Sequence, residues 1–181
     1  MSAKHTALLT SFILLLFSAA GYFAFMEEQG NFHSITAGEA YRSAQLDRDE
    51  LEYYLKKYGI KSILNLRGRN PNASWYWEEI EVSATHGVAH FDIPLSATVA
   101  PRSEDIGKMI EIFKSAPRPI LIHCQAGADR SGLAAAIWKV IVDGRTKKEA
   151  AGQLSLLYGH LPVGPTAAMD HYFENWEPSS L

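Results

Sequence analysis

The chain contains 181 residues, of which 47% are hydrophobic and 20% charged, and its formal net charge is -3. These values are close to those of ordinary globular proteins and argue against a wholly disordered chain. A weakly acidic chain without a basic block also gives no electrostatic reason to expect nucleic acid as a partner.

The first predicted element is an apolar segment, residues 6–26, which contains no Asp, Glu, Lys or Arg. As a helix rising about 1.5 Å per residue it would be roughly 30 Å long, enough to span the core of a bilayer. Its apolarity on all sides argues against a buried core helix. We predict a transmembrane anchor, or an uncleaved signal. The small residues Ser18, Ala19 and Ala20 leave a cleaved signal peptide open as an alternative.

The charges at the two ends of this segment differ, because Lys4 precedes it and Glu27 and Glu28 follow it. This asymmetry places residues 1–5 in the cytoplasm and the rest of the chain on the non-cytoplasmic side. Residues 27–31 are expected to form a juxtamembrane spacer. Residues 32–181 have the length of one domain.

In the remaining sequence, short apolar runs alternate with helical patterns. Strands are predicted at residues 60–66, 88–93 and 120–122, with a short edge strand inside 38–44. Helices are predicted from Asp47 to Tyr58, from Trp75 to Thr85, from Ser103 to the prolines at 117 and 119, from Gly132 to Val142, from Thr146 to about Tyr158, and from Thr166 to Trp176. Asp47, Ser103 and Thr146 are expected to be N-caps. The alternation predicts an α/β fold with a central, mostly parallel sheet flanked by helices.

Cys124 is the only cysteine in the chain, so it cannot form an internal disulfide or a cysteine-rich zinc site. It follows the predicted strand at 120–122, and Arg130 lies six positions later, where a helix begins. An inert core residue is the common role of a lone cysteine and stays open as an alternative.

A loop that leads into a helix N-terminus points several backbone N–H groups at one spot and favours a phosphate dianion there. The residues expected to bind substrate in this loop are Gln125, Ala126, Gly127 and Ala128. Arg130 can hold two phosphate oxygens at once. The same positive field favours the thiolate of Cys124, which would attack the phosphorus. Because amides and Arg130 supply the charge stabilisation, this chemistry requires no metal and no cofactor.

The run from His123-Cys124 to Arg130-Ser131 resembles the His-Cys-x5-Arg-Ser signature of the protein tyrosine and dual-specificity phosphatases. Tyr41–Gln45, Ile63–Arg67 and Ile93–Leu95 resemble short elements that precede the loop in the small atypical dual-specificity group. That group includes anchored or secreted bacterial members. The resemblance covers roughly residues 32–176. It implies a central sheet with helices on both sides and the phosphate loop at the carboxyl edge of the sheet.

The resemblance also implies an activity: hydrolysis of phosphotyrosine or related monoesters through a cysteinyl-phosphate, here on the periplasmic side of a membrane. The expected partners are a phosphorylated protein or a phospholipid as substrate, and the membrane through the N-terminal helix. Two alternatives stay open. One is a phospholipid or phosphoinositide phosphatase with the same chemistry, and the other is a catalytically dead phosphate-binding module. The sequence does not predict the oligomeric state.

Three neighbouring side chains have expected roles. His123 would orient the loop, unless it is simply a core histidine. Ser131 would hydrogen-bond the sulfur and ease its departure in the second step, or cap the helix. Arg67, with Arg69, would receive an anionic substrate at the rim, or lie in a solvated loop.

The general acid of the family has no clear counterpart in this sequence. Its members usually donate the proton from an aspartate in a separate loop about 30 residues before the cysteine. The corresponding residues here, 96–101, contain no carboxylate. We rank Asp129, inside the phosphate loop, first and Asp92, within a predicted strand, second. Asp105 or Glu104 comes third.

Overall fold

The computed structural model describes residues 3–178, and its centre is a five-stranded sheet with the order β1-β2-β5-β3-β4. The strands are β1 (His33–Thr36), β2 (Ala40–Ser43), β3 (Ser62–Asn65), β4 (Ala89–Asp92) and β5 (Ile120–His123). Neighbouring strands are parallel except β1, which pairs antiparallel with β2. The predicted α/β class and mostly parallel sheet are confirmed.

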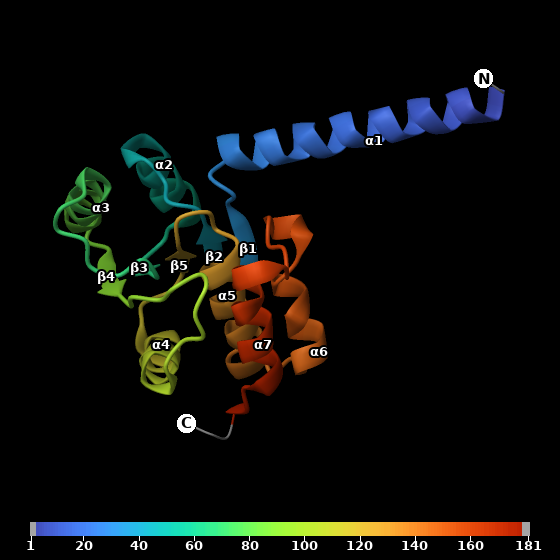
Figure 1. Ribbon diagram of the computed structural model, residues 1–181. Coiled ribbons are helices and arrows are strands. Elements are labelled where there is room, and N and C mark those ends of the chain that lie inside the picture. Colours follow the sequence, from blue (N-terminus) through green and yellow to red (C-terminus); the bar gives the residue numbers. More distant parts are fainter. Residues whose placement is uncertain (1–2, 179–181) are drawn as a thin grey trace.

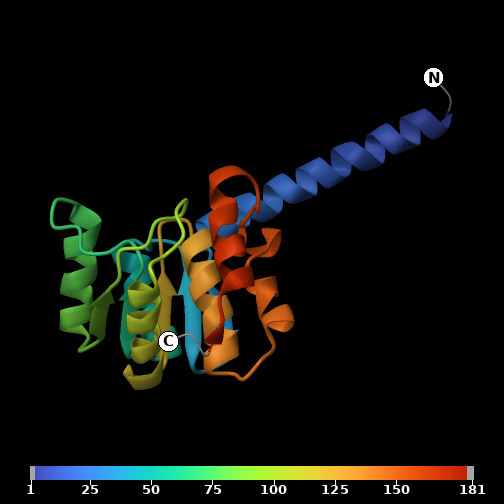
Figure 2. The ribbon, with the colours of Figure 1, turned by 60° about the horizontal axis from the view of Figure 1, so that its bottom comes forward.

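Helices cover both faces of the sheet (Figures 1 and 2). One face carries α2 (Arg48–Tyr58) and α3 (Ser74–Thr85). The other carries α4 (Ser103–Ser115), α5 (Asp129–Ile141) and α7 (Ala168–Asn175), with the short α6 (Lys147–Ala150) beside α5. Side chains alternate along β5: Leu121 packs on the α2 side, whereas Ile120 and Ile122 pack on the α5 side. The central strand is therefore buried on both faces.

Helix α2 begins and ends where local sequence chemistry predicts. The Asp47 side chain accepts a hydrogen bond from the Glu50 backbone N–H, and the Glu50 side chain accepts one from the Asp47 N–H. This reciprocal capping box satisfies two of the free N–H groups of the first turn. Gly59, with φ of 62°, adopts the left-handed conformation that ends the helix.

Strand β2 lies inside the sheet, so the prediction of an edge strand within 38–44 is wrong. The outer position belongs to β1, which the sequence pattern did not reveal. Ile35 is the only fully buried residue of β1. A four-residue strand with one buried side chain lacks the alternation that identifies strands in sequence.

Several helix limits also differ from those predicted. The helix capped by Thr146 ends at Ala150, and two 3-10 turns, Ala151–Gln153 and Leu156–Tyr158, replace the rest. Ser103 is not a cap, because Arg102 occupies that position and pairs with Asp105. Helix α5 begins at Asp129 rather than Gly132. Helix α7 begins at Ala168 after a 3-10 turn at Gly164–Ala167.

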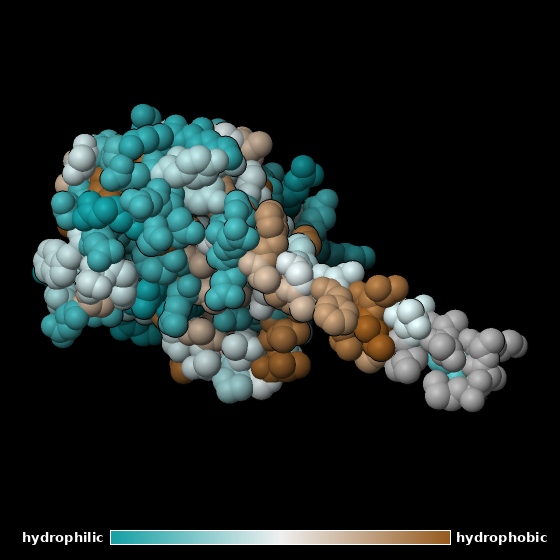
Figure 3. Space-filling view, turned by 90° about the horizontal axis from the view of Figure 1, so that it is seen from above, coloured by the Kyte–Doolittle hydropathy of each residue, from teal (hydrophilic) through white to brown (hydrophobic). Residues whose placement is uncertain are grey.

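Helix α1 (Ala3–Glu28) projects from the domain, and its part from Thr10 to Glu28 is long and apolar enough to cross a membrane or to be a signal sequence. Figure 3 shows apolar side chains along it and beside its base. Within the predicted spacer 27–31, Glu27 and Glu28 belong to α1, and Asn31 contacts the domain. Part of the predicted segment 1–5, and the last three residues of the predicted domain 32–181, lie outside the described residues.

Candidate active site

The lone cysteine lies directly after β5, at the carboxyl edge of the parallel strands. Cys124 is 2% exposed, and its Sγ atom is 3.4 Å from the Ser131 Oγ in the first turn of α5. Residues 125–128 form the loop between strand and helix. The structure therefore brings together Cys124 and Ser131, as the sequence predicts, with the thiol at the floor of the loop.

The carbonyl groups of this loop are held from outside. Gln125 O accepts from the Gln45 N–H at 3.1 Å, Ala126 O accepts from Asn31 Nδ2 at 2.9 Å, and Gly127 O and Ala128 O each accept from Arg42 Nη2 at 2.9 Å. In a trans peptide the next N–H points opposite to the carbonyl. The N–H groups of residues 126–129 thus face the inside of the loop. Among residues 3–178, no backbone carbonyl outside the loop accepts a hydrogen bond from them. Such a nest binds an anion.

Gly127 is required by this close packing. Its φ is 69°, and a Cβ there would lie 2.6 Å from Ala44 N and 2.7 Å from Ser43 C. Both obstacles are backbone atoms of the chain after β2, which cannot rotate away. The loop can approach β2 this closely only with glycine at position 127.

Arg42 braces the loop from inside the protein and is fully buried. Besides the two loop carbonyls, its Nη1 donates to Gln153 O at 2.8 Å and to Gln153 Oε1 at 3.2 Å, and its guanidinium lies 4.3 Å from the centre of the Tyr158 ring. Burial lowers the pKa of Arg42 to about 10, against the opposing influence of Cys124. A cation is thus held beneath the loop by carbonyl oxygens.

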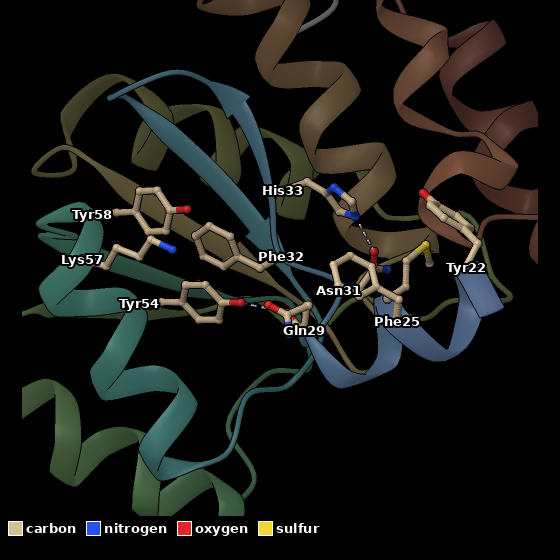
Figure 4. A pocket seen from close by; sticks show the side chains of 10 residues that line it. Tyr22, Phe25, Gln29, Asn31, Phe32, His33, Tyr54, Lys57 and Tyr58 are labelled. Atoms are coloured by element: carbon tan, nitrogen blue, oxygen red, sulfur yellow. Dashed lines mark hydrogen bonds between the residues drawn. The ribbon is translucent and has the colours of Figure 1, made fainter.

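The turn that follows α1 is joined to the same loop. Asn31 donates to Ala126 O and also to Tyr158 O at 3.0 Å. Figure 4 shows two further contacts of this turn: Asn31 Oδ1 is 2.8 Å from His33 Nε2, and Tyr54 of α2 donates to Gln29 O at 3.1 Å. The residues that follow the apolar helix therefore support the phosphate loop directly.

Arg130, predicted to clamp the phosphate, and Arg67, predicted at the rim, lie near each other. Arg130 Nη1 donates to Leu95 O at 3.4 Å, and its Nε is buried without a partner in the described chain. Arg67 donates to Gln45 Oε1 at 3.1 Å and stacks on the Trp75 ring at 3.7 Å. Burial first, and then the charge of Arg130, lower the pKa of Arg67. Two cations at one site favour a bound dianion.

His123 is held by a buried carboxylate that sequence reasoning missed. Its Nε2 lies 3.1 Å from Glu79 Oε2, and Glu79 also receives His90 Nε2 at 2.7 Å and Gln45 Nε2 at 2.8 Å. Burial alone would raise the pKa of Glu79, but the charge of His123 and these hydrogen bonds hold it well below its usual range. The network fixes the His123 ring behind the cysteine. Glu79 lies three positions after the buried Tyr76 and therefore on the buried face of α3. A carboxylate on that face is the sequence pattern that could have revealed this network.

Asp129 opens α5 and is held by a fully buried histidine, His160. The Nδ1 of His160 is 2.7 Å from Asp129 Oδ1, and its Nε2 is 2.8 Å from Asp170 Oδ2. Both ring nitrogens face carboxylates, an arrangement that favours the protonated ring. Burial opposes this charge, but the two aspartates outweigh it and raise the pKa of His160.

We expect Asp129→Asn to abolish the alkaline limb of the pH–rate profile, because an amide cannot donate the proton that the leaving group needs. His160→Gln should lower kcat, because glutamine cannot hold the carboxylates of Asp129 and Asp170 together as the His160 ring does. Steady-state kinetics as a function of pH for both variants checks these results. An unchanged alkaline limb in Asp129→Asn would show that Asp129 is not the proton donor.

The other acid candidates have different neighbours. Asp92 ends β4, and its two oxygens accept hydrogen bonds from Asn65 Nδ2 at 2.8 Å and Tyr76 Oη at 2.7 Å. Burial first, and then the hydrogen bond to Asp92, raise the pKa of Tyr76 to about 12. Asp105 pairs with Arg102, and Glu104 pairs with Lys108 at 2.5 Å. All four candidate carboxylates thus have partners, and Asp129 is the one that directly follows the phosphate loop, at the start of α5.

A buried thiol beneath converging amides and beside an arginine, at the edge of a parallel sheet, defines the phosphate loop of a cysteine-dependent phosphatase fold. A family model described as "DSP-PTPase phosphatase fused to NAD+ Kinase" matches residues 25–162. The chain belongs to this DSP-PTPase family.

Individual relatives share either part of the sequence or the fold. "Probable NAD kinase 2, chloroplastic" of Oryza sativa subsp. japonica is 30% identical over 104 residues, which are 56% of this chain and 10% of that protein. The chain thus spans a small part of that relative. P. aeruginosa TpbA matches with a TM-score of 0.65 and 19% identity over 81% of this chain and 85% of its own. The catalytic core of SIW14 from S. cerevisiae matches with a TM-score of 0.64 and 23% identity over 83% of this chain and 87% of its own. These two structures share the fold.

Proposed function

We propose that the chain is a cysteine-dependent phosphatase that hydrolyses phosphotyrosine or related phosphate monoesters. The observation that carries this proposal is the loop itself: Cys124 at its floor, the amides of residues 126–129 facing inward, and Arg130 beside them. Among relatives of the same fold, TpbA is described in complex with pTyr, and SIW14 is described as a PP-IP phosphatase.

The reaction runs in two steps. The Cys124 sulfur attacks phosphorus, and the phosphorus–oxygen ester bond breaks with its electron pair going to the leaving group, which takes a proton from Asp129. Water then attacks the cysteinyl-phosphate and gives its proton to Asp129. The sulfur–phosphorus bond breaks with its electron pair returning to Cys124. A hydrogen bond from Ser131 stabilises the departing thiolate, and the amides and Arg130 stabilise the phosphoryl oxygens in both steps.

We also propose that α1 anchors this domain on the non-cytoplasmic side of a membrane. Lys4 lies before the apolar segment and Glu27 after it, which is the charge bias expected for that orientation. Tyr22 donates to Leu157 O at 2.6 Å, and the side chains of Leu156 and Leu157 are exposed there. Apolar side chains beside the end of an anchor suit a membrane surface. Accessibility of the domain to protease in intact cells, compared with lysed cells, tests the orientation.

A second candidate substrate is a phospholipid monoester, favoured by the hydrogen bond that joins Asn31, just after α1, to the phosphate loop. The test compares kcat/KM of the full chain in mixed micelles for a tyrosyl phosphopeptide and for a lipid phosphate monoester. We expect the higher value for the peptide, because an aryl oxygen leaves more easily and demands less of the proton donor. A higher value for the lipid would replace the first proposal by the second.

A further inference from the structure

A pocket of 480 Å³ adjoins the phosphate loop and is partly built by α1. Its walls include Gln125, Ala126 and Ala128 of the loop. From the last two turns of α1 come Phe23 and Met26. Asn31 and Gln45, which hold the outward carbonyls of the loop, also line it. The end of the predicted anchor is therefore a wall of a pocket that lies beside the proposed phosphate site.

The charge of this pocket differs from that of the phosphate site. Glu27, from α1, and Glu50, from α2, line it, and no Lys, Arg or His is among its lining residues in the described chain. Glu50 is fixed in place because its carboxylate accepts the Asp47 N–H of the capping box. By contrast, Cys124 interacts electrostatically with Arg42 and Arg67, and Arg130 lies near Arg67. A substrate thus meets positive charge at its phosphate and negative charge beyond it.

We infer that this pocket receives the leaving group and selects substrates by its charge. It favours monoesters whose leaving group is neutral or cationic with an apolar part, and it disfavours polyanionic leaving groups. This inference rests on the proposed phosphatase function and narrows its substrate class. The apolar atoms of Phe23 and Met26 can cover an aryl or alkyl group, while two carboxylates repel added negative charge.

The test uses the full chain in non-ionic detergent and measures release of inorganic phosphate. The substrates are tyrosyl phosphopeptides flanked by lysine, alanine or glutamate, and an inositol polyphosphate. The wild type should prefer the lysine and alanine peptides, then the glutamate peptide, then the inositol polyphosphate. Glu27→Gln should raise the ratio of kcat/KM for the glutamate peptide to kcat/KM for the alanine peptide about threefold, the effect of one charge at about 6 Å in water.

Glu28→Gln is the matched control, because Glu28 has the same charge at the same end of α1 but lines a different pocket. Glu28→Gln should leave the ratio of kcat/KM for the glutamate and alanine peptides unchanged. A wild-type preference for the glutamate peptide or the inositol polyphosphate would overturn the inference, as would equal effects of the two variants. If the wild type hydrolyses no phosphopeptide in a Cys124-dependent way, the proposed function itself fails. If the phosphopeptides are hydrolysed but Glu27→Gln leaves the ratio of kcat/KM for the glutamate and alanine peptides unchanged, only the inferred charge selection fails.

Discussion

Replacing Cys124 by serine is expected to lower the turnover of an aryl phosphate by at least about a thousandfold. The serine hydroxyl would stay protonated where the thiol gives a nucleophilic thiolate, and no other cysteine can take its place. The inward amides and Arg130 remain, so the variant should still bind phosphate. Rapid quenching after mixing with labelled substrate should show an acid-stable phosphoenzyme in the wild type and none in the variant.

Ser131→Ala provides the complementary measurement. The Ser131 Oγ is 3.4 Å from the Cys124 Sγ, so its loss should slow departure of the sulfur more than the attack. The phosphoenzyme should then accumulate to a higher level than in the wild type, while steady-state turnover falls. A wild type that binds phosphate but never forms a phosphoenzyme would identify the chain as a phosphate-binding module without catalysis.

Arg42→Met is expected to cost about 2–4 kcal/mol of the free energy of unfolding and to reduce kcat by at least about tenfold. Arg42 is fully buried, and it donates to Gly127 O, Ala128 O and the backbone carbonyl of Gln153. Methionine fills similar volume but leaves these carbonyls without a donor. Since two of them belong to the phosphate loop, the loop should lose the orientation of its amides together with its stability.

Chemical denaturation and steady-state kinetics, performed on folded protein, check this result. Arg48→Met serves as the control, because Arg48 is an exposed arginine that pairs with Glu81 on the surface and should change either quantity little. Arg42→Lys keeps the charge, but the lysine cannot reach the loop and Gln153 together. Its stability and kcat should therefore lie between those of Arg42→Met and Arg48→Met. Wild-type activity and stability in Arg42→Met would show that the loop needs no internal brace.

Much of the phosphate site could be predicted from the sequence because it is local. Cys124, Gly127, Arg130 and Ser131 lie within eight consecutive residues, and a strand before them and a helix after them fix their directions. The capping box at Asp47 is local in the same sense. The α/β class followed from alternating patterns, which depend only on the spacing of apolar residues.

The residues that support the loop could be placed only by the tertiary structure. Arg42 is 85 positions from Gly127 along the chain, Asn31 is 95 from Ala126, and Glu79 is 44 from His123. Their sequence neighbourhoods do not indicate which distant carbonyl or ring they meet, and a buried charge is recognised only once its partners surround it.

By itself, then, the sequence determined the lone cysteine's strand–loop–helix setting and the apolar helix, because each depends on neighbouring residues in the chain. The tertiary structure alone decided what surrounds them: His160 between Asp129 and Asp170, and the end of α1 beside the loop. The physical reason is that hydrogen bonds and charges act through space. Parallel strands bring distant segments to one edge of the sheet, where those interactions decide the chemistry.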